Sequence, residues 1–260
     1  MRMLSFVYYH VAMAIGAAMR NAKYSIVSVE DDGATIKVRK VRAWYAPALI
    51  AAHATLMKVL NAGVRVLPNR RWAAHEQYMF ARLYNMQVRT GAAGVLVVPR
   101  IEGRTLSSLL ADEEVADDNR MRALALAVAS LAYLHQRGFT HGDAMADNVM
   151  VSLAAGIARW FDFENMHDSK RSKTWRQADD LRALVDTVMV RCPVHLRGNA
   201  LQVIIYGYPD VQVMRQMRSV NRSIWQRALP VHLGQAPLAF VDWHEVATMI
   251  EVIAGESEQG

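Results

Sequence analysis

The sequence predicts an α+β protein in which strands are concentrated in the first part of the chain and helices in the second. Strand-type stretches, either alternating or continuously apolar, are concentrated before about Pro99. After Gly103, most apolar residues recur at the three- and four-residue spacing of an amphipathic helix. With 260 residues, of which 53% are hydrophobic, the chain can bury a full core in one large domain or two lobes.

The first part begins with a predicted hairpin. Tyr24–Val29 alternates as a strand, Glu30–Gly33 supplies a turn, and Ala34–Val41 returns as the partner strand. Lys37 and Lys40 fall on opposite faces of the returning strand. Each is equally well explained as a solvated strand lysine or as a lysine that binds an anion.

Two helices and a buried strand follow the hairpin. Helical spacing predicts the first helix over Ala46–Asn61 and the second over about Arg71–Tyr84. Glu76 lies close to the apolar stripe of the second helix, which leaves two interpretations. It is either the functional partner of a lysine, or it caps the first turn or pairs with an arginine at the surface. The continuous apolar run Gly94–Ile101 predicts a buried strand.

Helices are predicted for most of the second part. A solvated acidic loop, Asp112–Asp118, precedes a long helix over Arg120–Arg137, which the following glycine ends. The pair Asp179–Asp180 is predicted to open a further helix, Leu181–Arg191, because acidic side chains favour a helix N-terminus. Amphipathic helices complete this part around His195–Tyr206, Val211–Trp225 and Trp243–Ile253.

The stretch from Leu134 to Asp168 carries the clearest chemical signal. Asp143 precedes Asn148 by five residues, and Asp162 follows the apolar end of the run Ile157–Phe161. A turn between the strands that follow Asn148 and precede Asp162 brings both residues to one end of a hairpin. Phosphoryl transfer needs one carboxylate to orient an attacking hydroxyl, and amide and carboxylate oxygens to hold magnesium. The spacing therefore indicates a phosphotransferase, and the alternative is an Asp-rich loop without chemistry.

These motifs resemble those of the protein-kinase-like superfamily. His141-Gly142-Asp143, four intervening residues and Asn148 resemble the catalytic loop, and Asp162-Phe163-Glu164 resembles the metal-binding Asp-Phe-Gly motif. Gly142 in place of arginine is the form seen in aminoglycoside and choline phosphotransferases and in bacterial lipopolysaccharide-core kinases. The resemblance implies a two-lobed protein-kinase-like fold, with a small sheet-containing N-lobe and a mainly helical C-lobe.

The resemblance also implies roles in the second lobe. Asn148 and Asp162 would bind Mg²⁺, and Asp143 would orient the acceptor hydroxyl toward ATP. His141 would pack under the catalytic loop as a structural residue. Asp180, or its neighbour Asp179, would brace the backbone of that loop.

In the first lobe, the resemblance implies a lysine that reaches the phosphates of ATP and a glutamate that pairs with it. Lys37 is the first choice for the lysine and Lys40 the second, and Glu76 is the choice for the glutamate. Two features depart from the family pattern: only Gly33 is available where a glycine-rich loop is expected, and Met145 stands where protein kinases carry a lysine.

Two alternatives to an active kinase remain open. One is a catalytically inactive kinase-like module that binds nucleotide. The other is a membrane-associated scaffold in which the apolar segments Leu4–Met19 and Ala46–Asn61 bind lipid. The first would bind nucleotide without turnover, and the second would bind vesicles whether or not Asp143 and Asp162 are intact.

Charge and cysteine content limit the partners and the compartment. A formal charge of +6 favours anionic ligands, and the basic run Ser169–Arg176 suits an anionic acceptor, although such a run is as often only solvated. The acceptor is a sugar, a lipid-linked small molecule or a protein serine or threonine, and no nucleic-acid binding is expected. The single cysteine, Cys192, is expected to be buried and cannot form an internal disulfide, which favours the cytoplasm.

The apolar segment Leu4–Met19 resembles a signal peptide, but export would separate an ATP-using enzyme from ATP. As a helix it would be about 24 Å long, short of the roughly 30 Å hydrocarbon core of a bilayer. Peripheral contact with a membrane therefore stays open. The expected organisation is an apolar helix over residues 1–20, a first lobe with an inserted helix over 21–102, a second lobe over 103–254 and a tail over 255–260.

Overall fold

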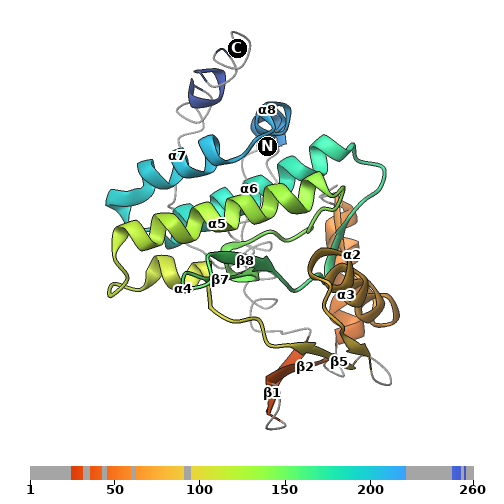
Figure 1. Cartoon of the computed structure of the whole chain (residues 1–260). Helices are drawn as coiled ribbons and strands as arrows, with labels where there is room; N and C mark the ends of the chain where they lie inside the picture. Colours follow the sequence, from red (N-terminus) through yellow and green to blue (C-terminus); the bar gives the residue numbers. More distant parts are fainter. Residues whose placement is uncertain are drawn as a thin grey trace, which may run out of the picture. The chain divides into compact units, whose positions relative to one another are not determined.

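The computed structural model describes seven stretches of the chain: residues 25–31, 36–42, 46–59, 63–90, 95–220, 248–252 and 255. They belong to two compact units. The first unit holds the described residues up to Arg100 together with Phe163–Asn165, and the second holds the rest (Figure 1). The predicted N-terminal helix and most of the predicted tail lie outside the described residues.

The first unit is built on a four-stranded antiparallel sheet with the order β1-β2-β5-β4. The predicted hairpin is confirmed as β1 (Ser25–Asp31) and β2 (Ile36–Arg42). The predicted buried strand is confirmed as β5 (Val95–Pro99), and β4 (Arg89–Thr90) pairs with its other edge. The backbone of Lys37 pairs with Pro99 on β5 and Glu30 on β1, and its side chain lies outside the described residues.

Two helices accompany this sheet in sequence, as predicted. α2 (Ala46–Val59) is followed by β3 (Val64–Val66), and α3 (Asn69–Tyr84) begins directly after Pro68, two residues earlier than predicted. β3 forms a two-stranded sheet with β9 (Asn165–His167). The apolar face of α3 forms much of the core of this unit, with fully buried Trp72, Met79 and Phe80. The Phe80 ring also packs edge-on against Phe163, with 6.0 Å between the ring centroids.

The second unit is mainly helical, and α5 (Asp117–Gln136) is its central element. α5 lies between α7 (Arg197–Gly207) and the hairpin of β7 (Val149–Ser152) and β8 (Ile157–Trp160) (Figure 1). The other described elements of this unit are β6 (Arg104–Thr105), α4 (Leu106–Ala111), the 3-10 turns η1 (Ala146–Asn148) and η2 (Val194–Leu196), α6 (Lys173–Arg191) and α8 (Val211–Val220).

β6 adds to the β7–β8 hairpin as a third strand, in the order β6-β7-β8. Gly103, just before β6, has a φ of 115°, and a Cβ there would lie 2.3 Å from the carbonyl oxygen of Val151. Only glycine fits so close to a neighbouring backbone with a positive φ. The chain therefore enters the second unit pressed against the strand that follows Asn148.

Two predicted helix starts are wrong. α5 begins at Asp117, so the end of the predicted acidic loop is helical and places its acids in the first turn. α6 begins at Lys173, eight residues before the predicted Leu181, because the Ser172 side chain caps it by accepting a hydrogen bond from the Trp175 N–H. Half of the predicted basic loop is therefore the first turn of a helix, and Asp179–Asp180 lies well inside it.

The α+β fold class, with a sheet-containing first unit and a mainly helical second unit, is confirmed. Cys192 is buried, as predicted. Of the predicted C-terminal helices, the structure describes α7, α8 as far as Val220, and a helical stretch over residues 248–252. Within the described part of the chain, no helix combines the length and the apolar character that crossing a bilayer requires.

Candidate active site

The end of α5 sets the direction in which the chain enters the candidate catalytic loop. Gly138 has a φ of 83°, its N–H donates to the carbonyl of His135, and the Phe139 N–H donates to that of Leu134. This pair of bonds is a Schellman cap, as the glycine in the sequence predicts. A rigid helix end therefore lies only a few residues before His141 and Asp143.

Within the loop, Asp143 and Asn148 are in direct contact. The Asn148 side-chain amide donates to the main-chain carbonyl of Asp143 at 2.9 Å and to its carboxylate at 3.2 Å. The Met145 N–H also donates to the Asp143 carbonyl, at 2.8 Å. Since both partners of the Asn148 amide are acceptors, the NH₂ group must face Asp143, and the amide oxygen is turned to the other side.

Asp162 lies on the segment that returns from β8. It has a φ of 67°, a left-handed conformation that costs about 1–2 kcal/mol for most side chains and that aspartate tolerates better than most. The neighbouring Phe161 N–H donates to the Asn148 carbonyl at 3.0 Å. The backbones that carry the two proposed metal ligands are therefore joined directly, and one of these two residues has the left-handed conformation.

His141 connects the same two segments from beneath. Its side chain is fully buried, its Nε2 lies 2.9 Å from the Phe161 carbonyl, and its ring packs edge-on against Trp160. Because a carbonyl only accepts, Nε2 must carry the hydrogen. Burial lowers the pKa of His141, which favours the neutral ring. The imidazole therefore has a structural role, since it links the start of the loop to the residue before Asp162.

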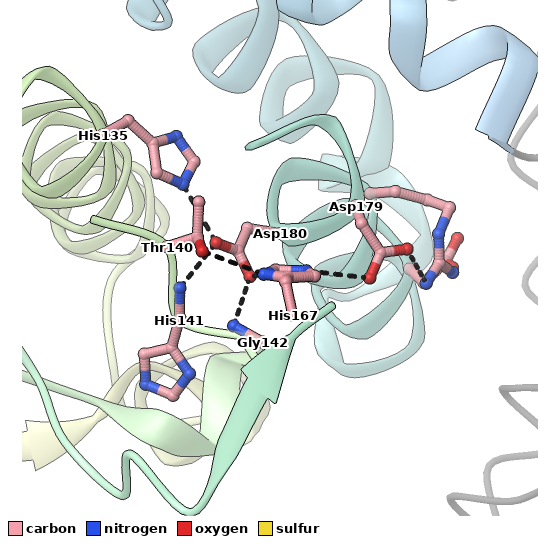
Figure 2. Close-up of polar contacts among 9 residues, drawn as sticks. His135, Thr140, His141, Gly142, His167, Asp179 and Asp180 are labelled. Carbon is pink, nitrogen blue, oxygen red and sulfur yellow. Dashed lines mark hydrogen bonds and ion pairs between the residues drawn. The ribbon is translucent and has the colours of Figure 1, made fainter. Parts of the chain in front are cut away.

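Asp180 holds the backbone at the start of the loop. Its carboxylate accepts hydrogen bonds from the N–H groups of His141 (2.7 Å) and Gly142 (2.8 Å) (Figure 2). Burial would raise the pKa of Asp180, but the neighbouring His167 and His135 outweigh burial and lower it to about 2. A charged carboxylate deep inside the second unit therefore fixes the two residues before Asp143.

A second residue of α6, which the sequence interpretation missed, holds the other end of the loop. The Thr187 hydroxyl accepts from the Ala146 N–H at 3.0 Å and lies within 2.8 Å of the Ala183 carbonyl, to which it donates. Thr187 follows Asp180 by seven residues, which is two helical turns. That spacing on one helix face is the signal that would have identified it.

The residues proposed for the first lobe lie in the first unit, whereas Asp143, Asn148 and Asp162 lie in the second. Glu76 is 1% exposed and lies in the second turn of α3. Glu76 is therefore neither in the first turn nor at the surface, where the two alternatives had it. A buried carboxylate is costly unless polar partners surround it, so Glu76 is a structural or functional anchor of this unit.

Comparisons with known proteins give likenesses among solved structures only. No family model matches the sequence, and no curated protein matches it either. Among solved structures, the chain is similar to one described as a medium-resolution structure of the bifunctional kinase-methyltransferase WbdD. The two are 21% identical with a TM-score of 0.42, over 72% of this chain and 41% of that one. This chain therefore spans less than half of that protein's length, and a likeness of this degree carries no argument about its chemistry.

Proposed function

We propose that the protein is an ATP-dependent phosphotransferase with a kinase-like active site. The observation that carries the proposal is the contact between Asp143 and Asn148, joined through the Asn148 and Phe161 backbones to Asp162. The Asp143 carboxylate and the Asn148 amide are thus in contact, and a backbone hydrogen bond joins Asn148 to the residue before Asp162, all within one unit. This set of groups suits phosphoryl transfer, where catalysis comes from positioning and charge neutralisation.

The donor set fits magnesium. Mg²⁺ prefers oxygen ligands and commonly uses one or two carboxylates together with substrate phosphates. Asn148 offers an amide oxygen, because its NH₂ group is committed to Asp143. Asp162 offers a half-buried carboxylate on a backbone in the left-handed conformation. These two residues would hold Mg²⁺ with ATP, and the bound metal would neutralise the charge of the phosphates.

Asp143 would act as the base that orients the acceptor. Its main chain is held by Met145 and Asn148, and its half-buried carboxylate also contacts the Asn148 amide, which limits its side-chain freedom. A carboxylate held in this way can accept the proton of an attacking hydroxyl. In the first unit, Glu76 and Lys37, with Lys40 as the second choice, would position the phosphates of ATP.

The acceptor is proposed to be a sugar, a lipid-linked small molecule or a protein serine or threonine, with an anionic character. Basic side chains gather where α6 begins: Lys170, Arg171, Lys173 and Arg176. The guanidinium of Arg171 lies 4.8 Å from the centre of the Trp175 ring, which orders part of this group. Such a surface would attract phosphate or carboxylate groups in the cytoplasm or at the face of a membrane.

The test is magnesium-dependent ATP binding and hydrolysis by the purified full chain and three variants. Asp162→Asn should lose metal-dependent nucleotide binding, because it removes a charged ligand. Asp143→Asn should bind MgATP normally but turn over about 100- to 10,000-fold more slowly, the range typical of losing a general base. Asp147→Asn is the matched control, because Asp147 is close in sequence but partly exposed and 3.8 Å from Arg191.

Each outcome decides between the alternatives. Slow turnover by the wild type and Asp147→Asn, but not by the Asp143 and Asp162 variants, supports the phosphotransferase. Nucleotide binding without turnover in the wild type would favour the inactive kinase-like module. Absence of nucleotide binding in every variant would refute the proposal.

A further inference from the structure

His167 is a buried residue that the motifs do not explain. It ends β9, five residues after Asp162, and its side chain is 0% exposed. Its Nδ1 lies 3.0 Å from the Thr140 hydroxyl, directly before the catalytic loop. Its Nε2 lies 3.3 Å from the carboxylate of Asp179 and 3.9 Å from that of Asp180 (Figure 2). One ring therefore contacts the start of the loop and α6 at once.

The surroundings of this ring are rich in negative charge. Asp179 and Asp180 face it from α6, and the Asp179 carboxylate also pairs with Arg182 at 3.1 Å. Arg182 in turn pairs with Asp186 at 2.6 Å, so one buried arginine serves two aspartates. Within the described part of the chain, no arginine pairs with the carboxylate of Asp180, whose partners are backbone N–H groups and histidines.

The ionised groups around His167 together favour its charged form. Asp179 and Asp180 attract a positive charge on the ring, whereas Arg176 on α6 opposes it. The nearby His141 is buried, and its lowered pKa favours the neutral ring. Burial disfavours the charge most strongly, but the two carboxylates outweigh the opposing effects, and the pKa of His167 is raised. Among the described residues, the ring also contacts the Thr140 hydroxyl and packs edge-on against Trp175, and neither of these groups titrates near neutral pH.

We propose that His167 is a positioning residue whose charged ring holds the segment after Asp162 to two aspartates of α6, Asp179 and Asp180, of which Asp180 also holds the catalytic loop. The inference rests on the proposed function, because it assigns His167 to the phosphotransfer site. Asp180 lies at the centre of the arrangement, since it faces His167 and also accepts from His141 and Gly142. Losing the charge on His167 would therefore make the position of Asp143 relative to Asp162 less well fixed.

The pH dependence has a definite sign. A histidine whose pKa is raised on folding stabilises the native arrangement fully below its unfolded pKa of about 6.5. That contribution is lost as the pH rises through the higher, folded pKa. The contacts of His167 with the loop and α6 should therefore be most stable in mildly acidic solution and should weaken toward alkaline pH.

The test uses amide hydrogen exchange at His141 and Gly142, which reports the loop whether or not the protein turns over ATP. Exchange is measured across pH 6 to 9 and corrected for the intrinsic rate of each amide. In the wild type, protection at these two amides should fall about tenfold as His167 loses its proton, while protection in the middle of α5 stays constant. Constant protection at His141 and Gly142 across this range would overturn the proposal, and this result needs no variant.

Two variants sharpen the result. His167→Gln keeps a donor near the position of Nε2 but cannot be charged, so protection at His141 and Gly142 should be low at every pH. His195→Gln is the matched control, because His195 also pairs with an aspartate, Asp117 at 3.1 Å, but is 66% exposed. It should behave like the wild type. Equal protection in the two variants would also count against a role for His167.

Kinetics then connect the exchange data with catalysis. In His167→Gln, kcat should fall about tenfold with the KM for MgATP nearly unchanged, because geometry rather than nucleotide binding is disturbed. The decline of wild-type kcat toward alkaline pH should also disappear in this variant. If kcat is unchanged in His167→Gln although the protection is reduced, His167 contributes only to stability, and its positioning role is overturned. A wild type that protects the loop as expected but has no turnover would instead refute the proposed function.

Discussion

The two units differ in how their candidate site residues are held. In the second unit, Asp143, Asn148 and the backbone around Asp162 are joined by hydrogen bonds that span only the loop and its hairpin. In the first unit, Glu76 lies on α3 and Lys37 on β2, about forty residues apart in sequence. Residues held together by local contacts can therefore be recognised from their spacing in the sequence. For residues on elements that are distant in sequence, the sequence gives only a choice of candidates.

The second unit also has a support that the motifs do not contain. α6 contacts the loop through Asp180 at its start and through Thr187 near its end. Both residues are buried and lie two helical turns apart on one face. The loop is therefore local in sequence but depends on a helix more than thirty residues further along the chain.

The largest effect in this comparison is expected from Asp180→Asn. The substitution removes a buried charge that accepts from two backbone N–H groups and faces His135 and His167. Breaking a buried ion pair by removing one partner costs about 3–5 kcal/mol, so the free energy of unfolding in urea should fall by that amount. Asp147→Asn, at a partly exposed carboxylate, should change it by less than about 0.5 kcal/mol.

The same carboxylate gives a pH signature. Its pKa is lowered from 3.8 to about 2, so its contribution to stability is present above the unfolded pKa and is lost as the pH falls from about 4 to 2. The difference corresponds to about 2 kcal/mol. In Asp180→Asn, the free energy of unfolding should therefore fall less steeply between about pH 4 and pH 2 than in the wild type. The same pH dependence in both proteins would mean that the carboxylate is not charged in the native state.

Sequence reasoning identified the loop because its residues are close together in the chain. Asp143, Asn148 and Asp162 needed only a spacing and a hairpin, and the structure places the first two in contact. His167 gave no comparable signal, because a histidine at a strand position is usually part of the core. The only signal for Thr187 was its spacing of seven residues from Asp180 on one helix face. Their roles depend on which face of α6 meets the loop, and that follows from packing across the unit.

The start of α6 shows a different kind of error. The pair Asp179–Asp180 looks like the acidic first turn of a helix, and the prediction placed it there. The helix begins earlier because Ser172 caps it, and its first turn is basic, against the preference of the helix dipole. Inside the helix, Asp179 pairs locally with Arg182, and both aspartates contact histidines from other elements. The contacts with the histidines are tertiary, and local propensity does not contain them.

The next largest loss of stability is expected from Glu76→Gln, in the first unit. The side chain is 1% exposed, so replacing the carboxylate by an amide of equal size should destabilise the protein by about 2 kcal/mol, as for losing a buried charged hydrogen-bond partner. If Glu76 also positions a lysine, MgATP affinity should fall in this variant. Glu113→Gln, at an exposed glutamate of the second unit, is the control. Unchanged stability would show that Glu76 is uncharged or well solvated.

Thr187→Val tests the second support of the loop. Valine keeps the shape but removes the oxygen that accepts from the Ala146 N–H, leaving that buried donor without its partner. The expected loss is about 1.5 kcal/mol, and hydrogen exchange at Ala146 should increase selectively. Thr187→Ser restores the hydroxyl and should recover the protection at Ala146. If Thr187→Ser loses the protection at Ala146 as Thr187→Val does, the hydrogen bond from the Ala146 N–H does not explain the effect.

The smallest effect is expected from Ser172→Ala, which separates the stability of α6 from the geometry of the loop. The Ser172 hydroxyl accepts from the Trp175 N–H at 3.1 Å at an exposed helix end, and losing such a cap costs about 1 kcal/mol. Ser172→Asp retains an acceptor and should keep the stability of the wild type. Because Asp180 lies two turns further along, the His141 and Gly142 amides should stay protected in Ser172→Ala while the first turn of α6 frays. Loss of protection at those amides would mean instead that the whole helix, rather than the pair Asp180 and Thr187, determines the geometry of the loop.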